Sequence, residues 1–338
     1  MCLTKEGVDV RKLFAILFIF LVVLAAGTAY VFYLLSPVDN LLDTTFTIEN
    51  GMSLGHVVKL LKEQGAIRSD YAFNLVNRFL KLGPIKTGEY DVKAGMSTLD
   101  IVKMFEKGSV KTVRVTIPEG YNLKQIAKTY AEKGVTGEEE FFSIVNSPSE
   151  ELLSGFPYDT HGNLEGFLFP DTYDFVKGTS AATVVKIMMN QFVKKMDSLL
   201  EKESSLSQYE LIILASIVER EAKFEDERPR IAQVFLNRLK ANIKLQSCAT
   251  IQFLLPQPKE RLLLKDLEID SPYNTYKVYG LPPAPICCPG YASMKACVEP
   301  SGEDYLYFVA MDSGHHVFSK TYADHIKAQN SPKSTAPN

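Results

Sequence analysis

The residue best placed to do chemistry is Glu219, which directly follows a long apolar run. The run LIILASIV fills residues 211–218, so a helix through it is expected to be buried for most of its length. At about 100° per residue, Glu219 lies roughly 80° around that helix from Leu211, at the edge of the apolar face. A carboxyl there loses water on one side, and desolvation favours its protonated form. We therefore expect Glu219 to serve as a general acid near neutral pH.

The alternative for Glu219 is the ordinary one for a glutamate at a helix end, a solvated or ion-paired side chain. Two more glutamates, Glu221 and Glu227, lie close by in the chain. We expect these two to form ion pairs with Arg228 and Arg238 and not to act as catalysts.

The elements around Glu219 follow from the spacing of apolar residues. Pro170 blocks a regular helix in the aromatic segment 164–175, so that segment is expected to be extended and packed. The remaining expected elements are a helix over 181–200, one or two helices over 208–239, a strand over 304–311 with a hairpin partner over 315–318, and a short helix over 321–329. The segment 330–338 reads as a polar tail.

Upstream, one pattern occurs three times, as a β-type run, a glycine turn and a helix-period stretch. The copies are FTIENGMSLGHVVKLLKEQG from Phe46, YDVKAGMSTLDIVKMFEKG from Tyr90 and VTIPEGYNLKQIAKTYAEKG from Val115. One such unit cannot bury its own apolar face, so the copies are expected to pack together. The pattern is similar to the LysM sugar-binding module, and this resemblance implies a glycan-binding region over 44–135. The alternative is generic β/α units without a ligand.

The N-terminal part contains an uncharged apolar stretch over 13–35. A span of about 20 helical residues crosses the hydrocarbon layer of a membrane. Arg11 and Lys12 precede the stretch and Asp39 follows it, which places 1–12 in the cytoplasm and the rest outside. The alternative is a cleaved signal peptide. The apolar run is longer than a signal peptide usually has, which favours a retained single-pass anchor.

The composition, and the spacing of the residue types that bind metals, argue against some classes of function. A net charge of −3 makes nucleic acid an unexpected partner. The cysteines form no paired CxxC units, and His315, His316 and His325 match no zinc spacing, so no metal is expected. The cysteines are interpreted mainly as structural thiols, with disulfides left open and with adjacent Cys287 and Cys288 not bonded to each other.

The segments that surround Glu219 resemble those of a known family. They are LASIVE over 214–219, ERPRIAQVFLNRL over 227–239, LQSCAT over 245–250, YNTYKVYGLPPAPI over 273–286, YLYFVA over 305–310 and LEGFLFPDTY over 164–173. Taken in their order along the chain, these segments resemble the YceG-like (MltG) family of endolytic murein transglycosylases, and the resemblance spans essentially the whole chain.

The resemblance implies a fold and an activity. The fold is α+β, with a transmembrane helix, LysM-like β/α modules and a mixed α+β catalytic domain over 155–329. The activity is cleavage of the MurNAc-β-1,4-GlcNAc bond inside nascent peptidoglycan strands, which leaves 1,6-anhydroMurNAc ends and terminates elongation. Glu219 is the catalytic residue, and no metal or organic cofactor is required. The protein is expected in the cytoplasmic (inner) membrane with its C-terminal domain outside, near peptidoglycan synthases.

The family loops also suggest residues that contact substrate. The candidates are Gln246, Ser247, Asn274, Tyr276 and Glu165. The alternative for each is that it orders its loop.

One departure from the family pattern concerns residues 248 and 249. The usual Asp-Pro of LQSDPT is Cys248-Ala249 here. A nucleophilic Cys248 has no histidine nearby in sequence, so a buried, inert thiol is the expectation.

Two rival functions remain open. One is a non-catalytic peptidoglycan-binding scaffold of the wall-synthesis machinery. The other is a hydrolase that uses a second carboxylate such as Glu165.

Overall fold

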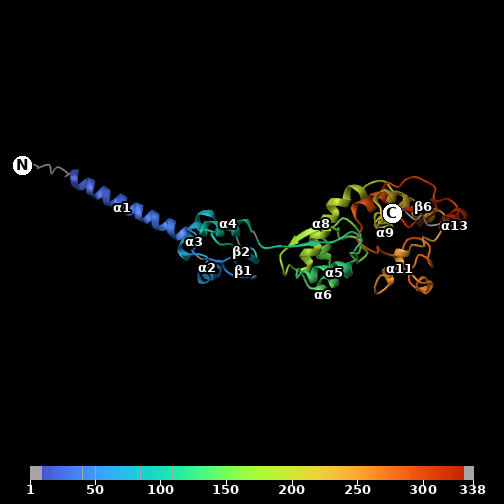
Figure 1. The fold of residues 1–338 in the computed structure, drawn as a ribbon, viewed down its shortest axis with the longest axis horizontal. Helices are drawn as coiled ribbons and strands as arrows, with labels where there is room; N and C mark the ends of the chain where they lie inside the picture. The colour runs from blue at the N-terminus through green and yellow to red at the C-terminus, as the bar shows by residue number, and fades with distance from the viewer. Residues whose placement is uncertain are drawn as a thin grey trace, which may run out of the picture. The chain divides into compact units, whose positions relative to one another are not determined.

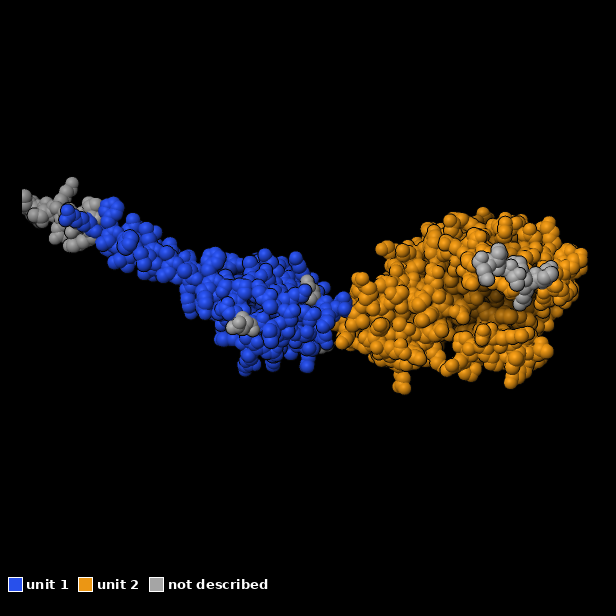
Figure 2. All heavy atoms as spheres, viewed as in Figure 1, with its two compact units in different colours: residues 1–112 blue, residues 113–338 orange. Residues whose placement is uncertain are grey.

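The computed structural model describes residues 10–39, 41–49, 51–81, 83, 85–108 and 110–330. The chain divides into two compact units, residues 1–112 and 113–338 (Figure 2). Both are built mainly from helices, and three antiparallel two-stranded sheets complete the described part of an α+β protein (Figure 1). The segment 1–9 and the tail from 331 onward lie outside the described residues.

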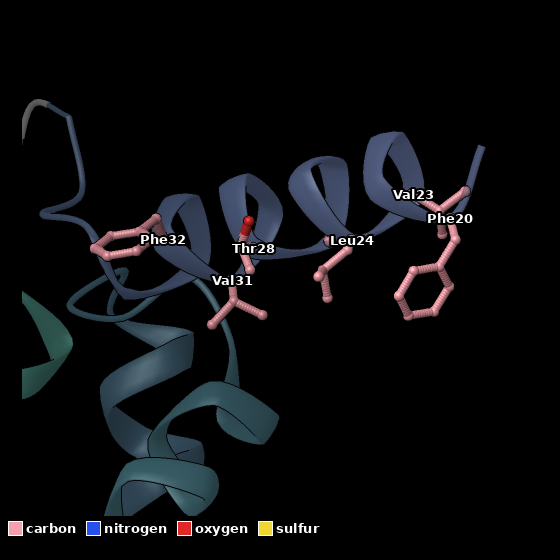
Figure 3. A pocket seen from close by; sticks show the side chains of 7 residues that line it. Phe20, Val23, Leu24, Thr28, Val31 and Phe32 are labelled. Atoms are coloured by element: carbon pink, nitrogen blue, oxygen red, sulfur yellow. The ribbon is translucent and has the colours of Figure 1, made fainter. Parts of the chain in front are cut away.

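The first unit begins with α1 (Val10–Leu35), whose apolar part Leu13–Leu35 has a mean hydropathy of 2.6 and is not buried. Its length and composition suit a membrane span or a signal sequence. Phe20, Leu24 and Val31 project from the same side of the helix around a shallow apolar depression (Figure 3).

The rest of the first unit packs two of the three repeats against each other. Strand β1 (Thr44–Ile48) pairs antiparallel with β2 (Gly88–Val92), and Phe46 lies opposite Tyr90. The helices are α2 (Leu54–Glu63), α3 (Asp70–Leu80) and α4 (Thr98–Lys107). Ser53 and Ser97 cap α2 and α4 as hydrogen-bond acceptors, which is why these helices start where they do. Helix α3 was not predicted.

The third repeat belongs to the second unit. Its strand β3 (Val113–Thr116) pairs antiparallel with β4 (Thr172–Phe175), and Val115 lies opposite Tyr173. Its helix α5 (Leu123–Glu132) contributes Ile126 and Tyr130 to the core of that unit. The expected packing of all three copies is therefore wrong for the third, which lies in a different core from the first two. The compact units divide between residues 112 and 113. The partner strand lies 60 residues further along the chain, since Arg114 pairs with Asp174. Similarity among the repeats does not predict which distant strand each of them pairs with.

The remaining elements of the second unit surround one buried helix. Helix α9 (Gln208–Glu221) is buried at every position from Leu211 to Val218 and packs against α10, α11 and α12. The other elements are α6 (Glu138–Asn146), α7 (Glu150–Leu153), α8 (Ala181–Leu200), the short η1 (Glu225–Glu227), α10 (Arg228–Lys240), α11 (Cys248–Leu254), η2 (Leu264–Glu268), α12 (Tyr291–Val298), β5 (Tyr307–Ala310), β6 (His316–Ser319) and α13 (Tyr322–Asn330).

Several of these elements confirm the sequence-based predictions. Helices α8, α9 and α10 cover the predicted ranges, and β5 and β6 form the predicted hairpin. Helices α11 and α12 were not predicted, since Pro256 and Pro258 follow α11 closely and the chain around α12 is rich in proline and glycine.

Candidate active site

The carboxyl of Glu219 is held at the last turn of α9 by two donors. Its side chain is only 5% exposed. Oε1 accepts a hydrogen bond from Nη2 of Arg228 at 3.0 Å, and Oε2 accepts one from the backbone N–H of Gly290 at 2.9 Å. The predicted position at the edge of the apolar face is confirmed, and the side chain is also ion-paired. An orientation this well defined is what a group that transfers protons to a bound substrate requires.

Arg228 connects the three helices that form this corner. It is the first residue of α10, its side chain is 13% exposed, and its Nε donates to Oγ of Ser293 on α12 at 2.9 Å. The expectation that Arg228 pairs with Glu221 or Glu227 is therefore wrong. Arg238 likewise donates to backbone carbonyls, among them that of Leu306 at 2.6 Å. Three-dimensional proximity, not separation in sequence, selects the partners.

A second carboxyl that the sequence analysis missed, Glu119, lies beside Glu219. It belongs to a turn that is joined to the 286–290 loop, since the N–H of Gly120 donates to the carbonyl of Cys288 at 3.0 Å. The Glu119 carboxylate lies directly over Gly290, where an added Cβ would come within 1.9 Å of its Oε1. Partial burial, and next the charge of Glu219, raise the pKa of Glu119. Its segment was interpreted only as the turn of a repeat, and no local pattern marks it as part of a site.

A small pocket of about 30 Å³ lies next to the residues that follow these carboxyls in the chain, Gly120 and Arg220. Gly120, at its edge, has φ +80°, and a Cβ there would lie 3.5 Å from Cγ of Glu219. The pocket is lined by Gly120, Asn122, Gln125, Arg220, Ala249, Gln252, Phe253, Pro258 and Ile286.

Of the predicted substrate-contacting residues, Gln246 and Ser247 lie at the start of α11. Ser247 is buried, accepts from the N–H of Ala249 as the helix cap, and donates its hydroxyl to Glu221. Gln246 is exposed in a left-handed conformation, with φ +52°, and its Oε1 accepts from Arg238 at 3.4 Å. Ser247 is therefore used within the protein, whereas the side chain of Gln246 remains accessible.

Asn274 and Tyr276 lie in the neighbouring loop. Asn274 is fully buried, and its Nδ2 donates to the carbonyls of Leu267 and Ile269 at 2.8 and 2.7 Å. Its Oδ1 accepts from the N–H of Tyr276 at 3.0 Å, so the amide is occupied in ordering the loop. The hydroxyl of Tyr276 lies 3.0 Å from Sγ of Cys248.

The four cysteines within the described residues are free thiols. Cys248 is exposed, so the expectation that it is buried is wrong. Its Sγ contacts the Tyr276 hydroxyl, and partial desolvation raises the pKa of its thiol. Cys287, Cys288 and Cys297 are buried, and desolvation raises the pKa of all three. Cys2 lies outside the described residues.

Glu165, the remaining candidate, is buried at the N-terminus of α5. It is 8% exposed, and both of its carboxyl oxygens lie 3.2 Å from the N–H of Leu123. Desolvation raises its pKa to about 8, against the opposing effect of the Leu123 N–H. This geometry favours the structural alternative, in which Glu165 caps a helix inside the core.

Glu227 and the histidines also have a structural arrangement. The Glu227 carboxylate accepts from the backbone N–H of His316 at 2.8 Å and lies 2.8 Å from its Nδ1 and 3.2 Å from Nδ1 of His315. These contacts fix the β5–β6 hairpin to the start of α10.

Comparisons with known proteins agree with this arrangement. The YceG-like family profile matches residues 46–331. The endolytic murein transglycosylase of Bacillus subtilis (strain 168) is 35% identical over 314 residues, which cover 88% of this chain and 87% of that protein. The protein of the same name from Streptococcus pneumoniae serotype 2 (strain D39 / NCTC 7466) is 30% identical over 352 residues, covering 93% of this chain and 64% of that relative. A crystal structure of a yceG-like protein from Listeria monocytogenes aligns with a TM-score of 0.58 at 32% identity, covering 85% of this chain and 99% of that one.

These matches and the mostly helical α+β fold place the chain in a class whose members are named transglycosylases. The chain belongs to the YceG-like family.

Proposed function

We propose that this protein is an endolytic lytic transglycosylase of peptidoglycan and that Glu219 is its catalytic acid and base. The observation that carries the proposal is the nearly buried Glu219 carboxyl, oriented by Arg228 and Gly290 at the end of α9. Family membership and the names of the relatives support the choice of substrate.

The proposed reaction uses one carboxyl twice. Glu219 gives its proton to the glycosidic oxygen as the C1–O bond between MurNAc and GlcNAc breaks. The C6 hydroxyl of the same MurNAc then attacks C1, and its proton passes to the Glu219 carboxylate. The ring closes as a 1,6-anhydro sugar, and the enzyme regains its starting protonation state. No water is consumed, so the second carboxylate that activates water in inverting hydrolases is not needed.

Two further features belong to the proposal. Helix α1 is a retained single-pass anchor in the cytoplasmic membrane, with the second unit outside, where nascent strands are made. The first unit binds glycan, and the groove between α2 and α3 is the candidate place. It is lined by Gly55, Val58, Lys59, Lys62, Glu63, Asp70 and Asn74.

The test is digestion of purified glycan strands, with mass spectrometry of the ends. The full chain in detergent and the soluble part from Asp43 onward are compared, each with Glu219→Gln as the matched control. Anhydro ends from the wild type alone are expected. New reducing ends would identify a hydrolase, and intact strands at every pH would favour the scaffold.

A further inference from the structure

The carboxylates of Glu119 and Glu219 meet at one glycine. The N–H of Gly290 donates to Oε2 of Glu219 at 2.9 Å, and the carboxylate of Glu119 lies over the α-carbon of Gly290. On the opposite side, Gly120 brings the same turn within contact distance of Glu219, since its added Cβ would lie 3.5 Å from Cγ. The Gly290 N–H and the Glu119–Gly120 turn thus bring the two carboxyls to one place, although they lie 100 positions apart in the chain.

The charges around this pair come from three segments, α10, η1 and α9. Arg228 of α10 bonds Glu219 directly, and Glu225 of η1 adds a second negative charge that acts on Glu119. Arg220 of α9 points to the Gly120 carbonyl at 3.5 Å. The charge of Glu219 also raises the pKa of two buried thiols, Cys287 and Cys297. Because burial raises both pKa values further, the two thiols are protonated at neutral pH. Glu119 and Arg228 are therefore groups of opposite charge that act on the same site, and Arg228 also lowers the pKa of Glu119.

We propose that Glu119 is a positioning residue whose negative charge favours the proton-bearing form of Glu219 and so opposes the effect of Arg228. The inference rests on the proposed function, since it concerns the proton that Glu219 transfers. Glu219 must first hold a proton and then, as a carboxylate, recover one. Arg228 stabilises the carboxylate of the second stage, and Glu119 favours the protonated acid of the first. Neither residue alone would make both stages accessible at one pH.

Removal of the Glu119 charge is expected to move the pH at which activity is lost. Without that charge, Glu219 gives up its proton at lower pH, so the alkaline limb of the kcat/KM profile shifts down by about one unit. The experiment compares the full chain in detergent as wild type, Glu119→Gln and Glu119→Asp. Glu151→Gln, on exposed α7, is the matched control.

The expected result is a shifted limb for Glu119→Gln and near wild-type limbs for Glu119→Asp and the control. At a pH on the wild-type alkaline limb, the Gln variant then loses about tenfold in rate, whereas on the acid side it approaches the wild-type rate. Equal loss at all pH values would overturn the proposal and indicate direct substrate contact or a structural role. Identical kcat/KM pH profiles for the wild type and Glu119→Gln would overturn the proposal too.

A second measurement does not depend on activity. Coupling between two titrating groups is reciprocal, so Glu219→Gln should lower the titration midpoint of Glu119 and Glu119→Gln that of Glu219. Both are measured by NMR with glutamate labelled at the side-chain carboxyl carbon, with each resonance assigned from its own variant. Unchanged midpoints would refute the coupling even in an active enzyme. If the midpoints shift in the variants but the wild type makes no anhydro ends, the proposed reaction is refuted and the coupling stands.

Discussion

Arg228 and Glu219 form an ion pair 3.0 Å long whose side chains are 13% and 5% exposed. Surface pairs contribute little to stability, but removal of one partner from a buried pair leaves an uncompensated charge, which is costly. The pair therefore links the stability of the α9–α10–α12 corner to the orientation of the proposed catalytic carboxyl.

The first prediction concerns Glu219 itself. Glu219→Gln keeps the size of the side chain and its acceptor for Gly290 but removes the transferable proton. Cleavage of glycan strands is expected to fall by about 100- to 10,000-fold, the range that general acid–base catalysis usually provides. Strand digestion measures the rate, and circular dichroism confirms that the variant is folded. A folded Gln variant with wild-type activity would refute the assignment.

The second prediction concerns Arg228. Arg228→Leu leaves Glu219 buried without its cationic partner, and a loss of about 3–5 kcal/mol in unfolding free energy is expected. Arg230→Leu is the control on the same helix, because Arg230 pairs with Glu303 at 3.2 Å and is 53% exposed. That change is expected to cost less than about 1 kcal/mol. Urea unfolding of the second unit measures both. Similar losses for the two variants would contradict the importance of burial.

The third prediction concerns the pH dependence of stability at Glu165. Burial raises its pKa from the ordinary 4.5 to about 8, so the folded state retains a proton that the unfolded state releases. Stability is therefore expected to fall as pH rises from about 4.5 to about 8, by roughly 5 kcal/mol in total, and then to level off.

Glu165→Gln tests this dependence. The amide retains an acceptor for the N–H of Leu123 but does not titrate, so this contribution to the slope disappears and the variant is more stable than the wild type at pH 9. Thermal unfolding from pH 5 to pH 9 measures the difference. Parallel curves for the two proteins would show that Glu165 is not the source.

The fourth prediction concerns membrane orientation. Cys248 is the exposed thiol among the described cysteines, whereas Cys287, Cys288 and Cys297 are buried. In intact cells that carry the Cys2→Ser variant, a membrane-impermeant maleimide is expected to label Cys248. Adding Cys248→Ser should abolish the labelling. Labelling that requires permeabilised cells would place the second unit in the cytoplasm.

Local spacing along the chain determined much of the fold. Apolar periodicity was enough to predict α8, α9 and α10, because each buries one face or all faces of a single continuous segment. The β5–β6 hairpin was predicted from two β-type runs that are close in the chain. The same spacing placed Glu219 at the edge of an apolar helix, where the structure has it.

Tertiary structure alone decided what surrounds that carboxyl. Gly290 lies 71 residues from Glu219 in the chain, and Glu119 lies on a turn that resembles those of two repeats in the other unit. Periodicity describes which face of an element is buried but not which loop covers it. Contacts between distant turns depend on how whole elements pack, so the partners of Arg228, the capping role of Glu165 and the Glu119–Glu219 pair emerged only when the second core was assembled.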